Sequence, residues 1–170
     1  MTKLLACVFI MLSALVFGTE LSKTEKKKLA LVAGICKALE MMHGELSARP
    51  AMMAELCADI SEKTVGEIRL FFESVTESLT SLGEISFSDI WSNALRNSFL
   101  ILDKQQLETL ESLGALMGSY QLSDQLCAIN NCKTELENDL RNLKERYENS
   151  KKLFLGIPCS LAAMLLVILI

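Results

Sequence analysis

The residues of this sequence that could carry metal or redox chemistry are six cysteines and one histidine, His43. The cysteines lie at positions 7, 36, 57, 127, 132 and 159, and no two of them form a C-x-x-C pair. Cys127 and Cys132 are five residues apart, which places them about 140° apart on a helix rather than on one face. A single histidine cannot complete a histidine-containing zinc site with thiols scattered in this way. We therefore expect free, mostly buried thiols in a reducing compartment, with no metal and no cofactor.

Motifs of nucleophilic, phosphate-binding and metalloprotease sites are absent from the sequence. It contains no G-x-S-x-G, no glycine-rich phosphate loop and no H-E-x-x-H. His43 precedes Gly44 near the end of a predicted helix, a setting typical of a surface or helix-end role. No catalytic residue is predicted, and the protein is not expected to be an enzyme.

The segment from Glu55 to Asp89 has the residues that point most clearly towards a function. It holds eight acidic residues against only Lys63 and Arg69. An exposed acidic surface attracts a basic protein partner and sets the rate and specificity of the encounter, although the same charges can simply keep a surface solvated. Glu73 and Glu77 lie one helical turn apart with no cation between them. The residues that we predict to bind a partner are Glu62, Glu67, Glu73, Glu77 and Asp89.

Composition and periodicity both predict an all-α fold. Leu, Met, Ala, Glu and Lys outnumber Val and Ile, and no stretch alternates as a strand would. Apolar residues instead recur at three- and four-residue steps in about six segments, which indicates a compact helical bundle. The expected inward residues of the successive helices are Val32, Ile35, Leu39, Met42 and Leu46; Met53, Leu56, Cys57 and Ile60; Val65, Ile68, Phe72, Val75, Leu79 and Leu82; Phe87, Ile90, Trp91 and Leu95; Leu107, Leu110, Leu113 and Met117; and Leu122, Leu126, Ile129, Leu136, Leu140, Leu143 and Tyr147.

Residues that favour helix ends mark the expected boundaries. Pro50 is expected to open the second helix, and Gly83 to end the third. The hydroxyl of Ser86 or Ser88 suits the start of the fourth helix, and Asp103 and Ser119 suit the starts of the fifth and sixth.

Both ends of the chain are apolar, because residues 4–18 and 153–170 contain no charged residue. The C-terminal run of 18 residues is just long enough to cross about 30 Å of hydrocarbon. We therefore predict a transmembrane anchor at 1–20, a helical domain at 21–152 and a second anchor at 153–170, with the first and last helices continuing into antiparallel anchors. The N-terminal run also resembles a signal peptide, and its cleavage would leave a secreted domain with a C-terminal anchor. An uncleaved anchor is favoured because the bulky Val16 and Phe17 occupy the place of a cleavage site.

The distribution of basic residues predicts the orientation of these anchors. Nine Lys or Arg residues follow the first run or precede the second, whereas only Lys3 lies on the other side. Basic residues near the ends of spans stay on the cytoplasmic side, so the middle is expected to be cytoplasmic. The middle segment, 20–152, holds 16 basic and all 21 acidic residues, a net charge of 16 − 21 = −5. This balance argues against nucleic-acid binding, which needs a clustered basic surface.

Three segments, in this order, resemble a known family. They are Ser86–Leu95, similar to a Ser-Phe-x-x-x-Trp-x-x-Ala-Leu segment; Leu113–Ser119, similar to a Leu-Gly-x-x-Leu-Gly turn that is followed by Leu122 and Gln125; and the tail from Lys151 to Ile170. Together with the two apolar ends, they resemble the stage III sporulation protein AB family over essentially the whole chain. Only Pro50 remains of the family's Tyr-Gly-x-x-Pro turn, and Gln121 stands where the family has an acidic residue.

The resemblance implies a part in the secretion-like channel complex that joins mother cell and forespore and is required for stage III of sporulation. It also implies similarity to the helical domain of the type II secretion system F protein, a membrane platform for a cytoplasmic ATPase. The expected location is the mother-cell membrane facing the forespore, as a multi-pass protein. The expected partners are other proteins of the complex, among them its ATPase, together with membrane lipid; self-association with further copies of the chain is an open alternative. The residues assigned to the structural turn are Leu113, Gly114, Gly118 and Ser119.

A function of another class remains open from the sequence. The heptad spacing of the last helix would also suit a sensory or receptor-type membrane protein that transmits a signal along that helix. Such a protein needs a ligand pocket in its helical domain, normally on the outer side of the membrane, and the charge distribution opposes that orientation.

Overall fold

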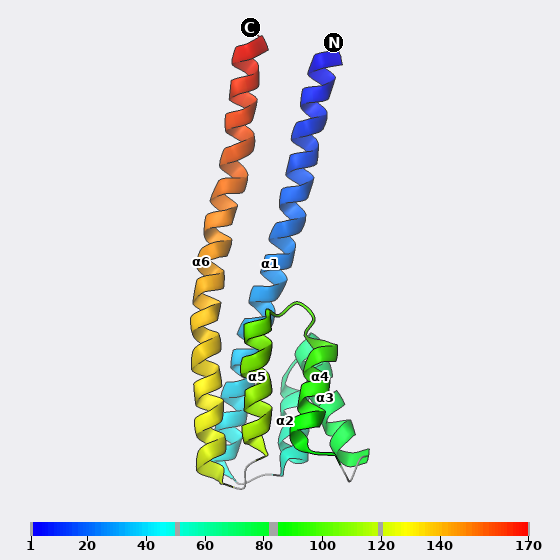
Figure 1. Cartoon of the computed structure of the whole chain (residues 1–170), viewed down its shortest axis with the longest axis vertical. Coiled ribbons are helices and arrows are strands. Elements are labelled where there is room, and N and C mark those ends of the chain that lie inside the picture. Colours follow the sequence, from blue (N-terminus) through cyan, green and yellow to red (C-terminus); the bar gives the residue numbers. More distant parts are fainter. Residues whose placement is uncertain (1, 50–51, 82–84, 119–120, 170) are drawn as a thin grey trace. The chain divides into compact units, whose positions relative to one another are not determined.

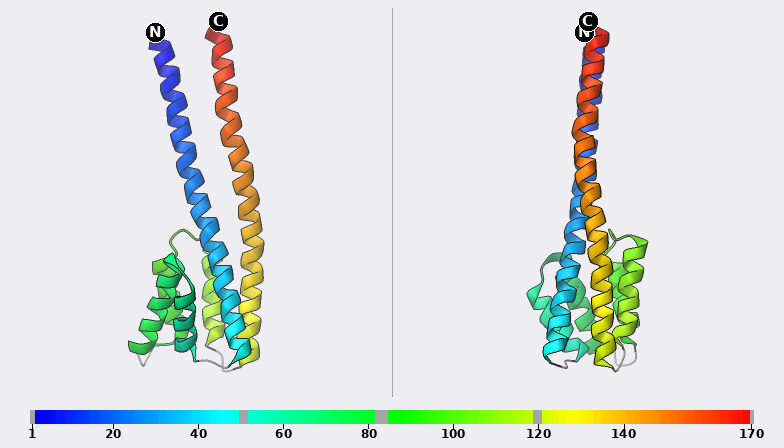
Figure 2. Two further views of the ribbon diagram at one scale, coloured as in Figure 1. Left: turned by 180° about the vertical axis from the view of Figure 1, so that it is seen from behind. Right: turned by 90° about the vertical axis from the view of Figure 1, so that its left-hand side faces the viewer.

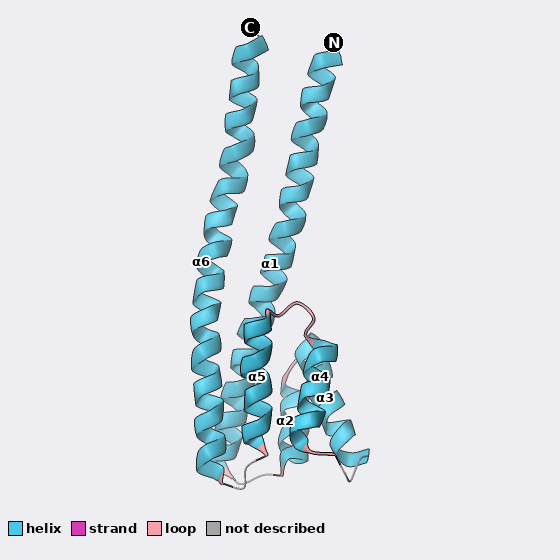
Figure 3. Ribbon diagram, in the orientation of Figure 1, coloured by secondary structure: helices cyan, strands magenta, loops and turns pink. Residues whose placement is uncertain are grey.

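The computed structural model describes the backbone of residues 2–49, 52–81, 85–118 and 121–169, and the side chains of residues 23–49, 52–79, 85–118 and 121–149. Over these ranges the chain forms six α-helices and no strand (Figures 1 and 3). They are α1 (Thr2–Ala48), α2 (Met53–Lys63), α3 (Gly66–Ser81), α4 (Phe87–Ser98), α5 (Lys104–Met117) and α6 (Leu122–Leu169). The prediction of an all-α fold with about six helices is confirmed.

The chain divides into two compact units. The first consists of Met1–Leu29 and Arg141–Ile170, and the second of Ala30–Leu140. The predicted anchors fall in the first unit, where the backbone is helical, and their side chains lie outside the described residues. In the part of the chain that the structure describes, no helix is both long and apolar enough to cross a membrane. The anchors and the boundaries at residues 20 and 153 stay predictions.

In the second unit, successive helices pack on each other. Helix α2 packs on α3, α3 on α4, and α4 on α5 (Figure 2). The loops between these helices are short, which favours antiparallel neighbours. Residues of α1 complete the core of this unit, since Ile35, Ala38 and Leu39 line the same interior space as Phe71 and Trp91.

The core follows the predicted apolar stripes closely. On α1 all five expected residues are buried, from Val32 to Leu46. On α3 the inner face carries Ile68, Phe72 and Val75, and the adjacent Phe71 is buried with them. Helix α4 contributes Trp91, which is 1% exposed and contacts the Phe71 ring at a centroid distance of 4.8 Å. An aromatic cluster between α3 and α4 therefore fixes the orientation of α3.

Of the predicted inward residues whose side chains the structure describes, two are exposed, and both precede or begin a helix. Val65 is 82% exposed because α3 begins only at Gly66, whose φ of +65° turns the chain just after it. Glycine tolerates this left-handed conformation, which strains other residues. Leu122 is 37% exposed as the first residue of α6. The three- and four-residue spacing therefore continues one residue beyond the buried stripe at the start of these two helices.

The predicted helix starts agree with the structure at two places. The Asp89 N–H donates to Ser86 Oγ at 3.2 Å, so Ser86 caps α4. The Asp103 N–H donates to Gln106 Oε1 at 3.2 Å, one part of the capping box at the start of α5. The prediction for α2 is wrong, because this helix begins at Met53 with Met52 as its N-cap. The boundary residues outside the described residues are Pro50, Leu82, Gly83 and Ser119.

Candidate functional site

The five acidic residues predicted to bind a partner lie on three helices that pack in sequence. Glu62 is near the end of α2, Glu67, Glu73 and Glu77 are on α3, and Asp89 is in the first turn of α4. All except the half-buried Glu73 are exposed. They are thus solvent-facing charges, as a docking surface requires.

Part of the acidic charge between Glu55 and Asp89 is neutralised by an arginine that precedes this segment. Arg49, the residue that follows α1, places its Nη1 2.7 Å from Glu55 Oε1 and its Nη2 2.9 Å from Asp59 Oδ2. The hydrogen bond to Glu55 raises the pKa of Arg49 above its usual range. A second ion pair has its acid on α1 and its cation on α2: Lys63 pairs with Glu45. The hydrogen bond from Lys63 lowers the pKa of Glu45. The α1–α2 corner is therefore a network of compensated charges.

Glu73 also forms an ion pair, with an arginine on the preceding turn. Arg69 Nε lies 2.7 Å from Glu73 Oε1, one helical turn away on α3. The hydrogen bond to Glu73 raises the pKa of Arg69. No cation lies between Glu73 and Glu77, as predicted, but Arg69 on the preceding turn supplies one to Glu73.

Two predicted residues, Glu62 and Glu67, have no hydrogen bond or ion pair among the described residues, although the charge of Glu62 is attracted to that of nearby Arg69. Glu67 stands in the first turn of α3, where the helix dipole stabilises a negative charge. Asp89 is held differently, because the Ser86 hydroxyl donates to its Oδ2 at 2.7 Å in the α4 cap. The open part of the acidic surface is therefore the side where α2 ends and α3 begins.

The residues assigned to the structural turn have packing and capping roles. Gly114 lies inside α5, and a Cβ built there would come within 2.3 Å of Trp91 Cδ1. Gly118 caps the end of α5, and Gln125 Nε2 of α6 donates to Met117 O at 3.1 Å. Leu113 is buried. Ser119 lies outside the described residues. The segment thus joins α5 to both α4 and α6.

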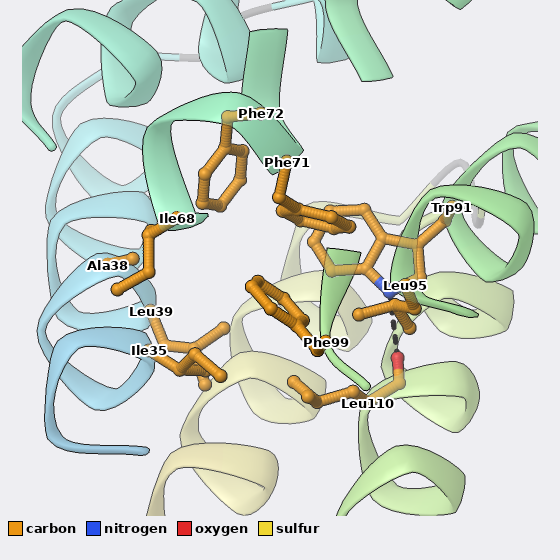
Figure 4. Close-up of a pocket in the computed structure, with 10 residues that line it drawn as sticks. All are labelled: Ile35, Ala38, Leu39, Ile68, Phe71, Phe72, Trp91, Leu95, Phe99 and Leu110. Carbon is orange, nitrogen blue, oxygen red and sulfur yellow. Dashed lines mark hydrogen bonds between the residues drawn. The ribbon is translucent and has the colours of Figure 1, made fainter. Parts of the chain in front are cut away.

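The interior of the second unit contains a void of about 10 Å³. Ten apolar side chains line it (Figure 4): Ile35, Ala38, Leu39, Ile68, Phe71, Phe72, Trp91, Leu95, Phe99 and Leu110. Figure 4 also shows the Trp91 Nε1–H directed at Leu110 O, at 2.8 Å. Such a volume is at the lower limit for one water molecule. This void cannot hold the ligand that a receptor would need.

Three of the four described cysteines are buried, as expected. Burial raises the pKa of Cys57 and Cys132 to about 12 and that of Cys36 to about 11. Cys127 is exposed on α6. Among the residues with described side chains, no group of three His, Cys, Asp or Glu residues is arranged to hold a metal ion. Protonated, buried thiols are poor nucleophiles and poor metal ligands.

Comparison with known proteins agrees with the resemblance seen in the sequence. A solved structure described as stage III sporulation protein AB (SpoIIIAB) matches with a TM-score of 0.63 and 18% identity, over 69% of this chain and 94% of that chain. This likeness shows a shared fold. No curated protein sequence gives a significant match. A family model described as Stage III sporulation protein AB matches residues 3–170. The chain therefore belongs to the stage III sporulation protein AB family.

Proposed function

We propose that this sporulation-family protein is a membrane-anchored adaptor of the secretion-like channel complex between mother cell and forespore, required for stage III of sporulation. In this proposal its helical domain is the platform on which a cytoplasmic ATPase docks. The observation that carries it is the exposed acidic surface around Glu62 and Glu67, mounted on two helices that pack firmly together. Other proteins of the complex, lipid around the anchors and further copies of the chain are the remaining proposed contacts.

The membrane part of the proposal rests on the charge-free ends of the sequence. Residues 1–20 and 153–170 would be antiparallel anchors in the mother-cell membrane facing the forespore. The nine basic residues next to these ends favour a cytoplasmic domain. That side of the membrane is also where an ATPase finds its nucleotide.

The acidic surface would act mainly on the rate at which the ATPase associates with the helical domain. Exposed charges at the rim of an interface attract a partner of opposite charge and exclude partners of like charge. Their effect is screened at distances beyond about 8 Å at physiological ionic strength. Binding of the ATPase should therefore weaken as salt rises, chiefly through a slower association rate.

Charge reversal at Glu62 and Glu67, two acids without an ion pair among the described residues, tests this proposal. We expect Glu62→Lys combined with Glu67→Lys to slow association of the purified full-length protein with the ATPase by about tenfold or more at low salt, and to block spore formation. Glu73 is unsuitable for this test, because a lysine there would also disrupt its ion pair with Arg69.

A matched control exists on α6. Asp124 is a first-turn acid like Glu67, and Glu135 is an exposed mid-helix acid. Reversing both changes the net charge by the same amount without touching α2 or α3. The proposal fails if the control pair and the test pair affect binding and sporulation equally, or if neither affects them.

The exposed Cys127 tests the orientation. An impermeant maleimide should leave Cys127 unlabelled in intact cells and label it after permeabilisation. Loss of this label in Cys127→Ser shows that it is attached to Cys127. Rapid labelling of Cys127 in intact cells would place the domain outside the cytoplasm.

A further inference from the structure

Helix α3 has an outer face that no other described element covers. Four of its exposed residues, Glu67, Leu70, Ser74 and Glu77, recur at three- and four-residue steps and therefore share one side of the helix, whereas the exposed Arg69 lies about 100° around the helix from Leu70. We call these four residues the α3 outer face. Leu70 is 63% exposed, although the opposite side of the same helix is buried in the aromatic cluster. Val65, 82% exposed, immediately precedes the helix.

An exposed leucine of this kind suits a protein interface. Interfaces concentrate their binding energy in a few apolar or aromatic anchors that become fully desolvated, while charged residues around them form a polar rim. Leu70 has Glu67 one turn before it and Glu73 one turn after it. The apolar anchor is thus bordered by acids on its own helix.

The charge of this surface decides between possible occupants. The cytoplasmic leaflet of a membrane is negatively charged, so Glu67 and Glu77 would oppose contact of Leu70 with lipid. A second copy meeting the same face would bring like charges together, because a two-fold interface pairs each patch with itself. The only cation on the described part of α3, Arg69, is bound to Glu73. A partner with positive charges on either side of an apolar residue fits the surface.

We infer that the α3 outer face, with Leu70 as its anchor, receives a basic amphipathic helix of a partner protein. This inference rests on the proposed platform function and names the surface and the chemistry of the bound segment. Glu67 and Glu77 are ten residues apart, which is about 15 Å along the helix axis. A partner helix lying along α3 places Lys or Arg at a similar separation on either side of its apolar contact with Leu70.

The test compares two leucines of similar exposure. Leu70→Gln removes the anchor and keeps a good helix former of similar size. Leu100→Gln is the control, because Leu100 is 84% exposed and lies between α4 and α5. Each full-length variant is reconstituted in lipid nanodiscs and titrated with two probes, the purified ATPase and a synthetic helical peptide of Leu and Lys. Circular dichroism and Trp91 fluorescence verify that both variants are folded.

We expect Leu70→Gln to weaken the binding of both probes by about tenfold or more, at low and at high salt, as loss of an interface anchor does. Leu100→Gln should bind as the parent does. If the parent and Leu70→Gln bind the ATPase equally, the inference is overturned and the platform function stands. If the ATPase binds no variant, the platform function fails, and the peptide alone decides whether Leu70 is an anchor. Loss of a dimer in Leu70→Gln, measured by sedimentation, would assign the face to a second copy and also overturn the inference.

Discussion

Replacing Gly114 by alanine separates packing from helix propensity, because the two effects have opposite signs. Gly114 lies within α5, where alanine is intrinsically favoured over glycine by about 1 kcal/mol. A Cβ at this position, however, would lie 2.3 Å from Trp91 Cδ1 and 2.7 Å from its Cγ. Real Cβ atoms do not approach other atoms so closely, so the indole ring or α5 must shift.

The indole has little freedom to move. Trp91 is 1% exposed, its Nε1–H donates to Leu110 O at 2.8 Å, and its ring contacts Phe71. Overpacking of a filled core costs about 1–3 kcal/mol. Weakening of the buried indole hydrogen bond adds about 1 kcal/mol. After the gain in helix propensity of about 1 kcal/mol, Gly114→Ala should destabilise the fold by about 1–3 kcal/mol.

Urea unfolding of the segment 21–152 measures this change, and Trp91 is the sole tryptophan, so its fluorescence reports directly on the perturbed site. Gly44→Ala in α1 is the matched control, since a Cβ there meets nothing within 4 Å. We expect the control to stabilise the fold by about 0.5–1 kcal/mol. Equal stabilisation by both substitutions, with unchanged tryptophan emission, would refute the packing argument.

Three further predictions concern the core and the thiols. Phe72 is 3% exposed, so Phe72→Ala should lower the free energy of unfolding in urea by about 3–5 kcal/mol. A variant that unfolds at the same urea concentration as the parent would show that this side of α3 does not face a core. With Cys7 and Cys159 replaced by Ser, native protein should react rapidly with a thiol reagent at Cys127 alone, and mass spectrometry of the labelled peptides would reveal any early reaction at Cys36, Cys57 or Cys132. Because folding raises the pKa of Cys57 from 9.0 to about 12, its thiol keeps its proton longer in the folded state than in the unfolded state. The stability from this group should be complete below its unfolded pKa and fall as pH rises through that value towards its folded pKa, by about 1.4 kcal/mol per pH unit. Cys57→Ala should reduce the loss of stability in alkaline urea titrations, and an unchanged pH profile would contradict it.

The interior of the fold could be predicted from the sequence because burial leaves a periodic signal. The α1 stripe from Val32 to Leu46 is buried as expected. Helix ends are harder, because an apolar residue next to a helix can match its spacing by chance. Val65 matches the α3 stripe in spacing, yet Gly66 takes a positive φ and leaves Val65 outside the helix. The conformation of a single residue decides such a boundary.

The acidic surface is more compensated than the sequence predicts, for two different reasons. Arg49 pairs with Glu55 and Asp59 across the turn between α1 and α2, and no count confined to residues 55–89 could include it. The pairing of Arg69 with Glu73, by contrast, follows the ordinary spacing of an ion pair one turn apart. That pair could have been foreseen. Among the described residues, the predicted acids without an ion pair or capping hydrogen bond include Glu62 and Glu67, which lie where α2 ends and α3 begins.

The two sides of α3 explain how this surface can still be selective. On the inner side, Phe71 and Phe72 pack against Trp91, with ring centroids 4.8 and 6.0 Å from the indole. This packing holds the backbone of α3 rigid before any partner arrives, so Leu70 need not be ordered on binding by a change in the helix. A surface ordered in advance loses less entropy on association, and the binding energy of a few contacts is then retained. Changes on the inner side should therefore alter stability and binding together, whereas Leu70→Gln should alter binding alone.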